Sequence, residues 1–466
     1  MKHNTIKSDF ISQKTRFNAS YFLNDDALNS YKIEKYKNKC VQLFEIAEVY
    51  NPPIFKRQFC QKSDNAVQYC QSSDVTNLLE GSVVFINKKQ AEKVGSIVRI
   101  NQILVTGFGT IGNTKLVNEL SEGISYANNV CRIEASSNIP YGYIYAFMSS
   151  KYGKSQLNKN SSGSVVRYIE APGIKKTFIP IISDIKLFES HNLILESSNL
   201  RVEANKMLNV VSRKIKNLLS LNDLNNSEYE SFGNSNCNRK VSTFSRNINE
   251  FNLETINAFN YSKKIELLRK KFSSSNSRSL LSCLDEKGLF STGSFKRLET
   301  VSDKGIMLIN QSDIFNSKII GKNISRKFIG NSKLVDYGEV LIAGVGTLGE
   351  GETFCRVIFA NELIENQLVS GEFIRMKTNV DIPSGYLFAL LSSDYGFRII
   401  RSTQSGTKLC RPISRLLEQI PIPILSKEEM DNIDFTVKKA HTNYYLAAIK
   451  ENQAIDLIEK EIDAWQ

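Results

Sequence analysis

The chain has 466 residues, more than one ordinary hydrophobic core fills, so two or three domains are expected. Hydrophobic residues make up 41% and charged residues 23%, which favours a folded globular protein and disfavours a disordered one. Sixty Lys and Arg against 48 Asp and Glu give a formal charge of +12, which favours an anionic partner without establishing one.

The N-terminal segment and the cysteines disfavour secreted, membrane and metal-binding proteins. Residues Met1–Lys7 lack the apolar core of a signal peptide, and no run approaches the roughly eighteen apolar residues of a membrane span. Eight cysteines form no Cys-x-x-Cys pair, and His3, His191 and His441 lie far apart. We therefore expect no metal site, reduced and mostly buried thiols, a cytoplasmic location and no membrane partner.

In chain order, the first domain is expected over residues 1–182. Short β-type runs such as Val83–Ile86 and Gln102–Val105 precede one helix candidate, Ile144–Leu157. Strands and helices in one segment predict a mixed α/β domain.

A long Pro-free stretch over 183–221 predicts the first of two long helices. Its apolar residues follow the a and d spacing of a coiled coil, namely Leu208, Val211, Ile215 and Leu218. The next segment, 222–249, is rich in Asn and Ser and has little periodicity, so we expect a linker.

A second domain is expected over 250–425, with a loop at Ser273–Ser279 and a helix at Leu387–Ile400. The second long helix, 426–466, carries a seam made of Ile455, Ile458, Ile462 and Trp465. The predicted fold class is thus α+β: two similar mixed α/β domains joined by two long helices that form an antiparallel coiled coil.

An internal duplication relates the two domains. Six short motifs recur in the same order about 240 residues further along the chain. The pairs are Phe55-Lys56-Arg57 with Phe295-Lys296-Arg297, Ser73-Asp74-Val75 with Ser312-Asp313-Ile314, Val105–Gly112 with Ile342–Gly349, Gly142–Ser150 with Gly385–Ser393, Ser162-Gly163-Ser164 with Ser405-Gly406-Thr407, and Phe178–Pro180 with Pro421–Pro423. The segments between them differ, as expected of one scaffold with two recognition surfaces.

Two patterns resemble enzyme motifs. Asn51-Pro52-Pro53-Ile54 is similar to the Asn-Pro-Pro-aromatic loop of amino-methyltransferases, but Ile54 replaces the aromatic and no Gly-rich strand–loop–helix unit precedes it. Gly107-x-Gly109-x-x-Gly112 has the spacing of a dinucleotide fingerprint, yet a turn and a strand are expected after it rather than a helix. We interpret the first as a loop. We interpret the glycines of the second, in both copies, as the positive-φ positions of a tight hairpin or bulge.

The repeated residues suit binding better than catalysis. Lys56-Arg57 and Lys296-Arg297 lie beside aromatic residues, where they can meet phosphates or guanine edges. The Ser-Gly-Ser/Thr segments allow close approach of backbone to phosphate. For each single cation, a solvated loop charge explains the pattern equally well.

Taken together, the ordered motifs resemble those of the DNA-specificity subunit of type I restriction–modification systems. The resemblance begins at Arg16–Phe22, follows the six repeated motifs and ends in the Ile-Pro segments that lead into the long helices. It covers nearly the whole chain. The start of the second domain, Ile256–Tyr261, matches Arg16–Phe22 only loosely.

The resemblance implies a non-catalytic subunit in which each domain reads one half of a bipartite site in double-stranded DNA. The predicted DNA-contacting residues are Lys56, Arg57, Thr110, Lys115, Ser162, Ser164, Arg167, Lys296, Arg297, Thr347, Ser405, Thr407, Lys408 and Arg411. The long helices would set the spacing of the half-sites and dock two methyltransferase subunits. The residues predicted for this docking are Arg213, Lys216, Ile455, Ile458, Ile462 and Trp465.

The chain itself would bind no cofactor. The resemblance implies that partner methyltransferase subunits use S-adenosylmethionine, and that restriction subunits, where they join, use ATP and magnesium. Two rivals remain open: a self-contained DNA methyltransferase or restriction enzyme, and a coiled-coil adaptor that binds only proteins.

Overall fold

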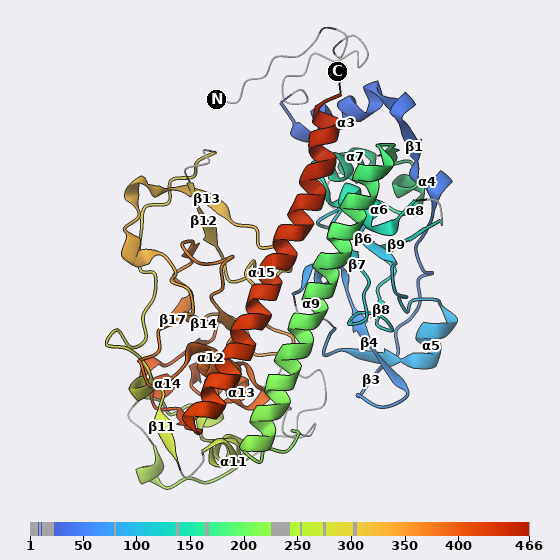
Figure 1. Cartoon of the computed structure of the whole chain (residues 1–466). Helices are drawn as coiled ribbons and strands as arrows, with labels where there is room; N and C mark the ends of the chain where they lie inside the picture. Colours follow the sequence, from blue (N-terminus) through green and yellow to red (C-terminus); the bar gives the residue numbers. More distant parts are fainter. Residues whose placement is uncertain are drawn as a thin grey trace. The chain divides into compact units, whose positions relative to one another are not determined.

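The computed structural model describes residues 8, 11, 23–78, 81–136, 139–163, 167–224, 243–251, 254–273, 276–301 and 305–465. The chain divides into two compact units, one made of Met1–Val202 with Leu446–Gln466 and the other of Glu203–Tyr445. The division passes through the two long helices of Figure 1, α9 (Asp184–Leu218) and α15 (Lys427–Asp463), so each unit contains a part of both.

The first unit is built around two four-stranded sheets, with strand orders β2-β9-β6-β7 and β3-β5-β4-β8. Strand β6 lies inside the first sheet, and its continuous apolar run is buried on both faces. The elements are α3 (Asp25–Lys35), β1 (Cys40–Gln42), α4 (Leu43–Ile46), β2 (Ala47–Tyr50), β3 (Phe59–Cys60), β4 (Ala66–Cys70), β5 (Phe85–Asn87), α5 (Lys88–Lys93), β6 (Ile103–Thr106), β7 (Thr114–Leu116), β8 (Ser125–Tyr126), β9 (Val130–Ala135), α6 (Tyr141–Ser149), α7 (Lys151–Asn160), α8 (Ala171–Ile174) and β10 (Phe178–Pro180).

The second unit contains sheets of order β13-β12-β16 and β15-β14-β17 and the pairs β11-β20 and β18-β19. Its elements are α11 (Lys263–Phe272), β11 (Ser277–Ser279), β12 (Gly305–Ile309), β13 (Lys322–Ser325), β14 (Val340–Ala343), β15 (Val357–Phe359), β16 (Leu368–Val369), β17 (Phe373–Met376), α12 (Ser384–Ser392), α13 (Asp394–Arg401), β18 (Gln404–Ser405), β19 (Arg411–Pro412), α14 (Ser414–Glu418) and β20 (Pro421–Pro423). Part of the loop predicted at Ser273–Ser279 is wrong, because strand β11 occupies its last residues and pairs with β20.

Strand pairing confirms that the two units share one topology. In the first unit Leu104 of β6 faces Arg132 of β9, and in the second Leu341 of β14 faces Arg375 of β17. The parallel pair β4–β8 corresponds to β12–β16, and the antiparallel pair β1–β10 corresponds to β11–β20. The predicted class, two similar mixed α/β domains with two long helices, is therefore the observed one.

The helices predicted at Ile144–Leu157 and Leu387–Ile400 are each broken once. Ser150 ends α6 and begins α7, where its hydroxyl accepts a hydrogen bond from the amide of Gly153. Ser393 caps α13 in the same way. A serine side chain that satisfies the first amides of a helix favours a new start over continuation, and the apolar periodicity alone did not reveal it.

The long helices run antiparallel within the first unit. Lys186 of α9 pairs with Glu461 of α15 and Arg201 pairs with Glu451, so rising numbers on one helix meet falling numbers on the other. The hydroxyl of Ser197 also donates to the carbonyl of Ala447 at 2.7 Å. The predicted seam contributes to the core of this unit, because Ile455, Ile458 and Ile462 are buried.

In the second unit the other halves of the same helices contribute to its core. Val211 and Ile215 of α9 belong to one buried cluster with Met430, Ile433 and Val437 of α15. The side-chain amide of Asn205 donates to the hydroxyl of Tyr444 at 2.9 Å. Among the described residues, no helix combines the length and apolar character needed to cross a lipid bilayer.

Candidate nucleic-acid interface

The Gly107–Gly112 segment forms the predicted hairpin between antiparallel strands β6 and β7. Gly109 and Gly112 have φ of 72° and 82°, a region that disfavours residues with a Cβ atom. Strand β7 follows the loop, so no helix N-terminus is present to hold a pyrophosphate. The hairpin interpretation is confirmed for this copy.

A second loop of the first unit lies against this hairpin. Ser162 and Tyr168 exchange two backbone hydrogen bonds of 2.8 and 2.9 Å. Tyr168 also forms a β-bridge with Phe108, and the amide of Ile169 donates to the carbonyl of Gly107 at 2.8 Å. The two motifs, far apart in the sequence, therefore form one surface, which we call the first loop pair (residues 107–112, 161–163 and 167–168).

Three predicted DNA-contacting residues are exposed on the first loop pair: Thr110, Ser162 and Arg167. Arg167 donates to the carbonyl of Asn158 and has further guanidinium donors to offer. Ser164 lies outside the described residues.

The second unit has an equivalent second loop pair (residues 344–349 and 405–411). Gly346 and Cys410 exchange backbone hydrogen bonds of 3.2 and 2.7 Å, and Ser405 faces Arg411 across β18 and β19. The segment again connects antiparallel strands, β14 and β15, but the prediction that its glycines supply the left-handed positions is wrong. The left-handed residue is Cys355, with φ of 66°. Gly344 is instead required by close packing, since a Cβ atom would lie 2.6 Å from the carbonyl oxygen of Glu372.

Buried arginines of α13 hold the second loop pair in place. Arg401 donates to the carbonyl of Gly349 at 2.8 Å, and Arg398 pairs with Glu350 at 2.7 Å. The ring of Phe397 lies 4.0 Å from the guanidinium of Arg401. Burial lowers the pKa of Arg401 to about 10, so it remains charged at neutral pH. These supports were missed, because no matching arginines occur in the first copy.

The exposed surface of the second loop pair carries positive charge. Ser405, Thr407, Lys408 and Arg411 are exposed as a DNA contact requires, and Thr347 is half-buried. Lys115, in contrast, is only 9% exposed on β7, because it points to the inner side of its strand. It does not fit a phosphate contact.

The repeated Lys-Arg residues lie in irregular segments outside the two loop pairs. Lys56 and Arg57 precede β3, and Arg57 donates to the hydroxyl of Tyr69 at 3.1 Å. Lys296 lies 4.8 Å from the ring of Phe328, and Arg297 follows it. All four cations are exposed. Aromatic neighbours orient these side chains without neutralising them.

Asn51 of the Asn-Pro-Pro segment has a structural role. Its side-chain amide donates to the carbonyl of Asn128 at 2.8 Å, and its side-chain oxygen accepts from the amide of Ala171 at 2.8 Å. The amide is thereby engaged at both ends, while Ile54 is 86% exposed. This arrangement supports the interpretation as a loop. Among the described residues, no cluster of His, Cys, Asp or Glu suits a metal ion.

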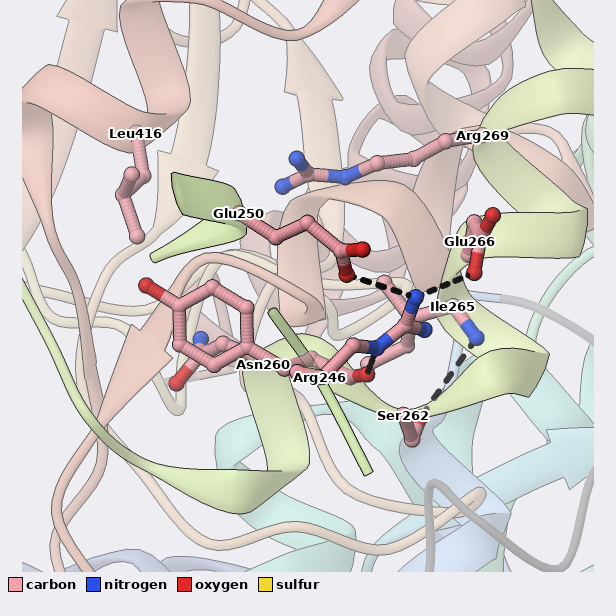
Figure 2. A pocket seen from close by; sticks show the side chains of 9 residues that line it. Arg246, Glu250, Asn260, Ser262, Ile265, Glu266, Arg269 and Leu416 are labelled. Atoms are coloured by element: carbon pink, nitrogen blue, oxygen red, sulfur yellow. Dashed lines mark hydrogen bonds and ion pairs between the residues drawn. The ribbon is translucent and has the colours of Figure 1, made fainter. Parts of the chain in front are cut away.

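A cavity of about 400 Å³ lies at the start of the second unit (Figure 2). Arg246 forms ion pairs there with Glu250 and Glu266, at 3.1 and 2.7 Å. Beside it, the side chain of Asn260 donates to the carbonyls of Ser402 and Gln404, at 2.6 and 2.9 Å. The cavity residues therefore brace the segment that enters the second loop pair.

The predicted docking residues need correction. Ile455, Ile458 and Ile462 are buried inside their own unit, so they are not available to a partner. Trp465 packs edge-on against Tyr36 at 5.6 Å. Lys216 pairs with Asp223 at 2.7 Å and lies 3.8 Å from Asp394. Of this set, Arg213 is the residue that the structure leaves exposed. Seam residues that are buried within their own chain cannot also contact a partner protein.

Other apolar residues on the long helices are exposed. Ile185 and Phe188 of α9 are 81% and 53% exposed in the first unit. Val210 of α9 and Phe435 of α15 are 51% and 69% exposed in the second. Large exposed apolar side chains on a helix are typical of interaction surfaces.

Comparisons with known proteins gave weak structural similarities. No protein-family model and no curated protein matches the chain. A type I restriction–modification S subunit from M. genitalium is similar over 91% of this chain and 92% of its own, with 12% identity and a TM-score of 0.34. The HsdS subunit from Thermoanaerobacter tengcongensis is similar over 91% and 95%, with 12% identity and a TM-score of 0.25. The type IIG restriction endonuclease BpuSI is similar over 40% and 29%, with 8% identity and a TM-score of 0.29. Similarities at this level establish no function by themselves.

Proposed function

We propose that this chain is the DNA-specificity subunit of a type I restriction–modification complex. The observation that carries the proposal is the duplication of one fold, each copy of which has a loop pair with exposed hydroxyl groups and cations. Each unit would read one half of a bipartite site. Linking two readers makes the second binding event intramolecular, which raises affinity without new contacts.

In this proposal the chain supplies recognition and its partners supply chemistry. Two methyltransferase subunits would use S-adenosylmethionine, and restriction subunits, where present, would use ATP and magnesium. The complex would act in the cytoplasm. The engaged amide of Asn51 supports a chain without methyltransferase activity of its own.

Selection from a random duplex pool, with the chain bound to its methyltransferase, tests this function. We expect enrichment of two short sequences at a fixed gap, and binding that weakens with salt by a log–log slope near −0.9 per phosphate contact. Enrichment of a single uninterrupted sequence, or of none, would contradict the proposal. Crosslinking of S-adenosylmethionine to the isolated chain would favour the enzyme rival.

Removing the cations of the second loop pair should affect one half-site. We expect the double variant Lys408→Ala, Arg411→Ala to weaken specific binding by about 1–3 kcal/mol for each lost base contact and to relax one half of the motif. Lys439→Ala, an exposed cation on α15 of the same unit, should leave the motif unchanged. Titration and motif selection at fixed salt measure both effects. Relaxation of both halves would contradict the assignment of one unit to one half-site.

Methyltransferase docking is expected on the exposed apolar residues of the long helices. Phe188→Asp and Phe435→Asp should each weaken assembly by tenfold or more, because a charge replaces an aromatic contact in the interface. Analytical ultracentrifugation of the mixed subunits measures this loss. The controls are Phe188→Leu and Phe435→Leu, which keep an apolar side chain at the same exposed positions and should preserve assembly. Unchanged assembly of both phenylalanine variants would move the docking surface elsewhere.

A further inference from the structure

The two loop pairs place different side chains at one equivalent position. Ser162 faces Tyr168 in the first unit, and Ser405 faces Arg411 in the second. The two serines are equivalent in the duplication, so Tyr168 and Arg411 are equivalent as well. One scaffold position thus carries a ring in one unit and a guanidinium in the other.

The ring of Tyr168 packs against a second aromatic ring. It stacks on Phe108 with 5.5 Å between centroids and 20° between ring planes. The two side chains remain 40% and 36% exposed. Backbone hydrogen bonds join Tyr168 to Ser162 and Ile169 to Gly107. The two rings are therefore positioned without a ligand. Val345 occupies the place of Phe108 in the second unit, where no such ring pair forms.

The two arrangements suit different base edges. A guanidinium fork matches the two acceptors of guanine in the major groove. An aromatic pair offers mainly apolar surface, and the apolar group that DNA exposes in the major groove is the methyl group of thymine. Arg167, next to Tyr168 and exposed, places beside the ring pair a cation of the kind that contacts phosphate.

We propose that Phe108 and Tyr168 recognise a thymine methyl group in the half-site read by the first unit, whereas Arg411 recognises guanine in the other half-site. This inference rests on the proposed function and adds the chemistry of each reader to it. Double-stranded DNA is the occupant that fits both loop pairs, because the same position is cationic in one copy and flanked by a cation in the other.

Uracil substitution tests the inference, since uracil differs from thymine by the methyl group alone. Each thymine of the selected duplex is replaced in turn, and binding by the assembled complex is measured. For the unaltered chain we expect about fourfold weaker binding at one or two thymines of a single half-site, the loss of one buried methyl contact. Phe108→Ala and Tyr168→Ala should bind thymine and uracil duplexes equally at those positions.

Arg411→Ala is the matched control. It should retain the discrimination of uracil from thymine and lose preference for guanine in the other half-site. Retained sequence preference of Phe108→Ala and Tyr168→Ala at the other positions of the first unit's own half-site shows that the first unit of these variants is folded.

Two outcomes separate the proposals. A bipartite motif whose thymines discriminate equally in all variants, or whose half-sites show no uracil effect, would overturn this inference alone. The absence of a bipartite motif would overturn both the proposed function and this inference.

Discussion

Lengthening both long helices by four residues where the two units divide will change the gap between the half-sites and leave the half-site sequences unchanged. Four helical residues add about 6 Å, and one base pair of DNA occupies about 3.4 Å, so the gap should grow by one or two base pairs. The insertions belong after Val202 in α9 and after Tyr445 in α15.

Both helices must be lengthened together. Arg201 pairs with Glu451 on one side of the division and Asn205 contacts Tyr444 on the other, so an insertion in α9 alone would put one of these contacts out of register. An insertion near Val211 would interrupt the buried cluster of the second unit.

Mapping of the methylated sequence by the assembled complex measures this effect. A variant with the insertion in α9 alone serves as the control and should lose stability rather than acquire a new gap. Altered half-site sequences in the doubly lengthened chain would contradict the division of labour between units and helices.

Removing the carboxylate of Glu339 should destabilise the second unit by about 3–5 kcal/mol, because it leaves a buried guanidinium without its counter-charge. Arg375 donates two hydrogen bonds of 2.8 Å to Glu339, and the side chains are 1% and 0% exposed. We expect urea unfolding, measured by circular dichroism, to show its first transition at a lower urea concentration in Glu339→Ala than in the unaltered chain.

A second variant and the fluorescence of one tryptophan serve as controls for this experiment. Glu299→Ala breaks an exposed pair with Lys322 and should cost less than about 1 kcal/mol. The single tryptophan, Trp465, belongs to the first unit, so its fluorescence reports whether that unit unfolds separately. A transition of Glu339→Ala that coincides with that of Glu299→Ala would contradict the prediction.

In the first unit, the equivalent arginine has different hydrogen-bond partners. Arg132 is buried at the matching sheet position and donates to carbonyl oxygens, including those of Ser96 and Tyr126, at 3.0 and 2.8 Å. Burial lowers its pKa to about 10, and backbone dipoles rather than a carboxylate solvate its charge. The duplicated fold therefore keeps the cation and has changed its partner.

Local patterns predicted the duplication, the long helices and the hairpin of Gly109 and Gly112, because periodicity and glycine spacing act within a few residues. The contact between Gly107 and Ile169 was not predictable, since nothing in either segment specifies a partner so distant in sequence. Lys115 was selected by charge alone, although its burial depends on which way its strand faces. Ile455, Ile458 and Ile462 were recognised as a seam and then also assigned to a partner, when the seam packs within the chain.

The first unit is completed by the last part of the chain. Ala454, Ile458 and Ile462 belong to the same buried cluster as Tyr143 and Phe147. During synthesis these last residues leave the ribosome after every other part of the first unit. The domain that is translated first therefore waits longest for its core, and the second unit, whose residues are contiguous from Glu203 to Tyr445, can close before it. An unfinished chain would expose the apolar face of the first unit, and such exposed surface makes a partly folded chain prone to aggregate.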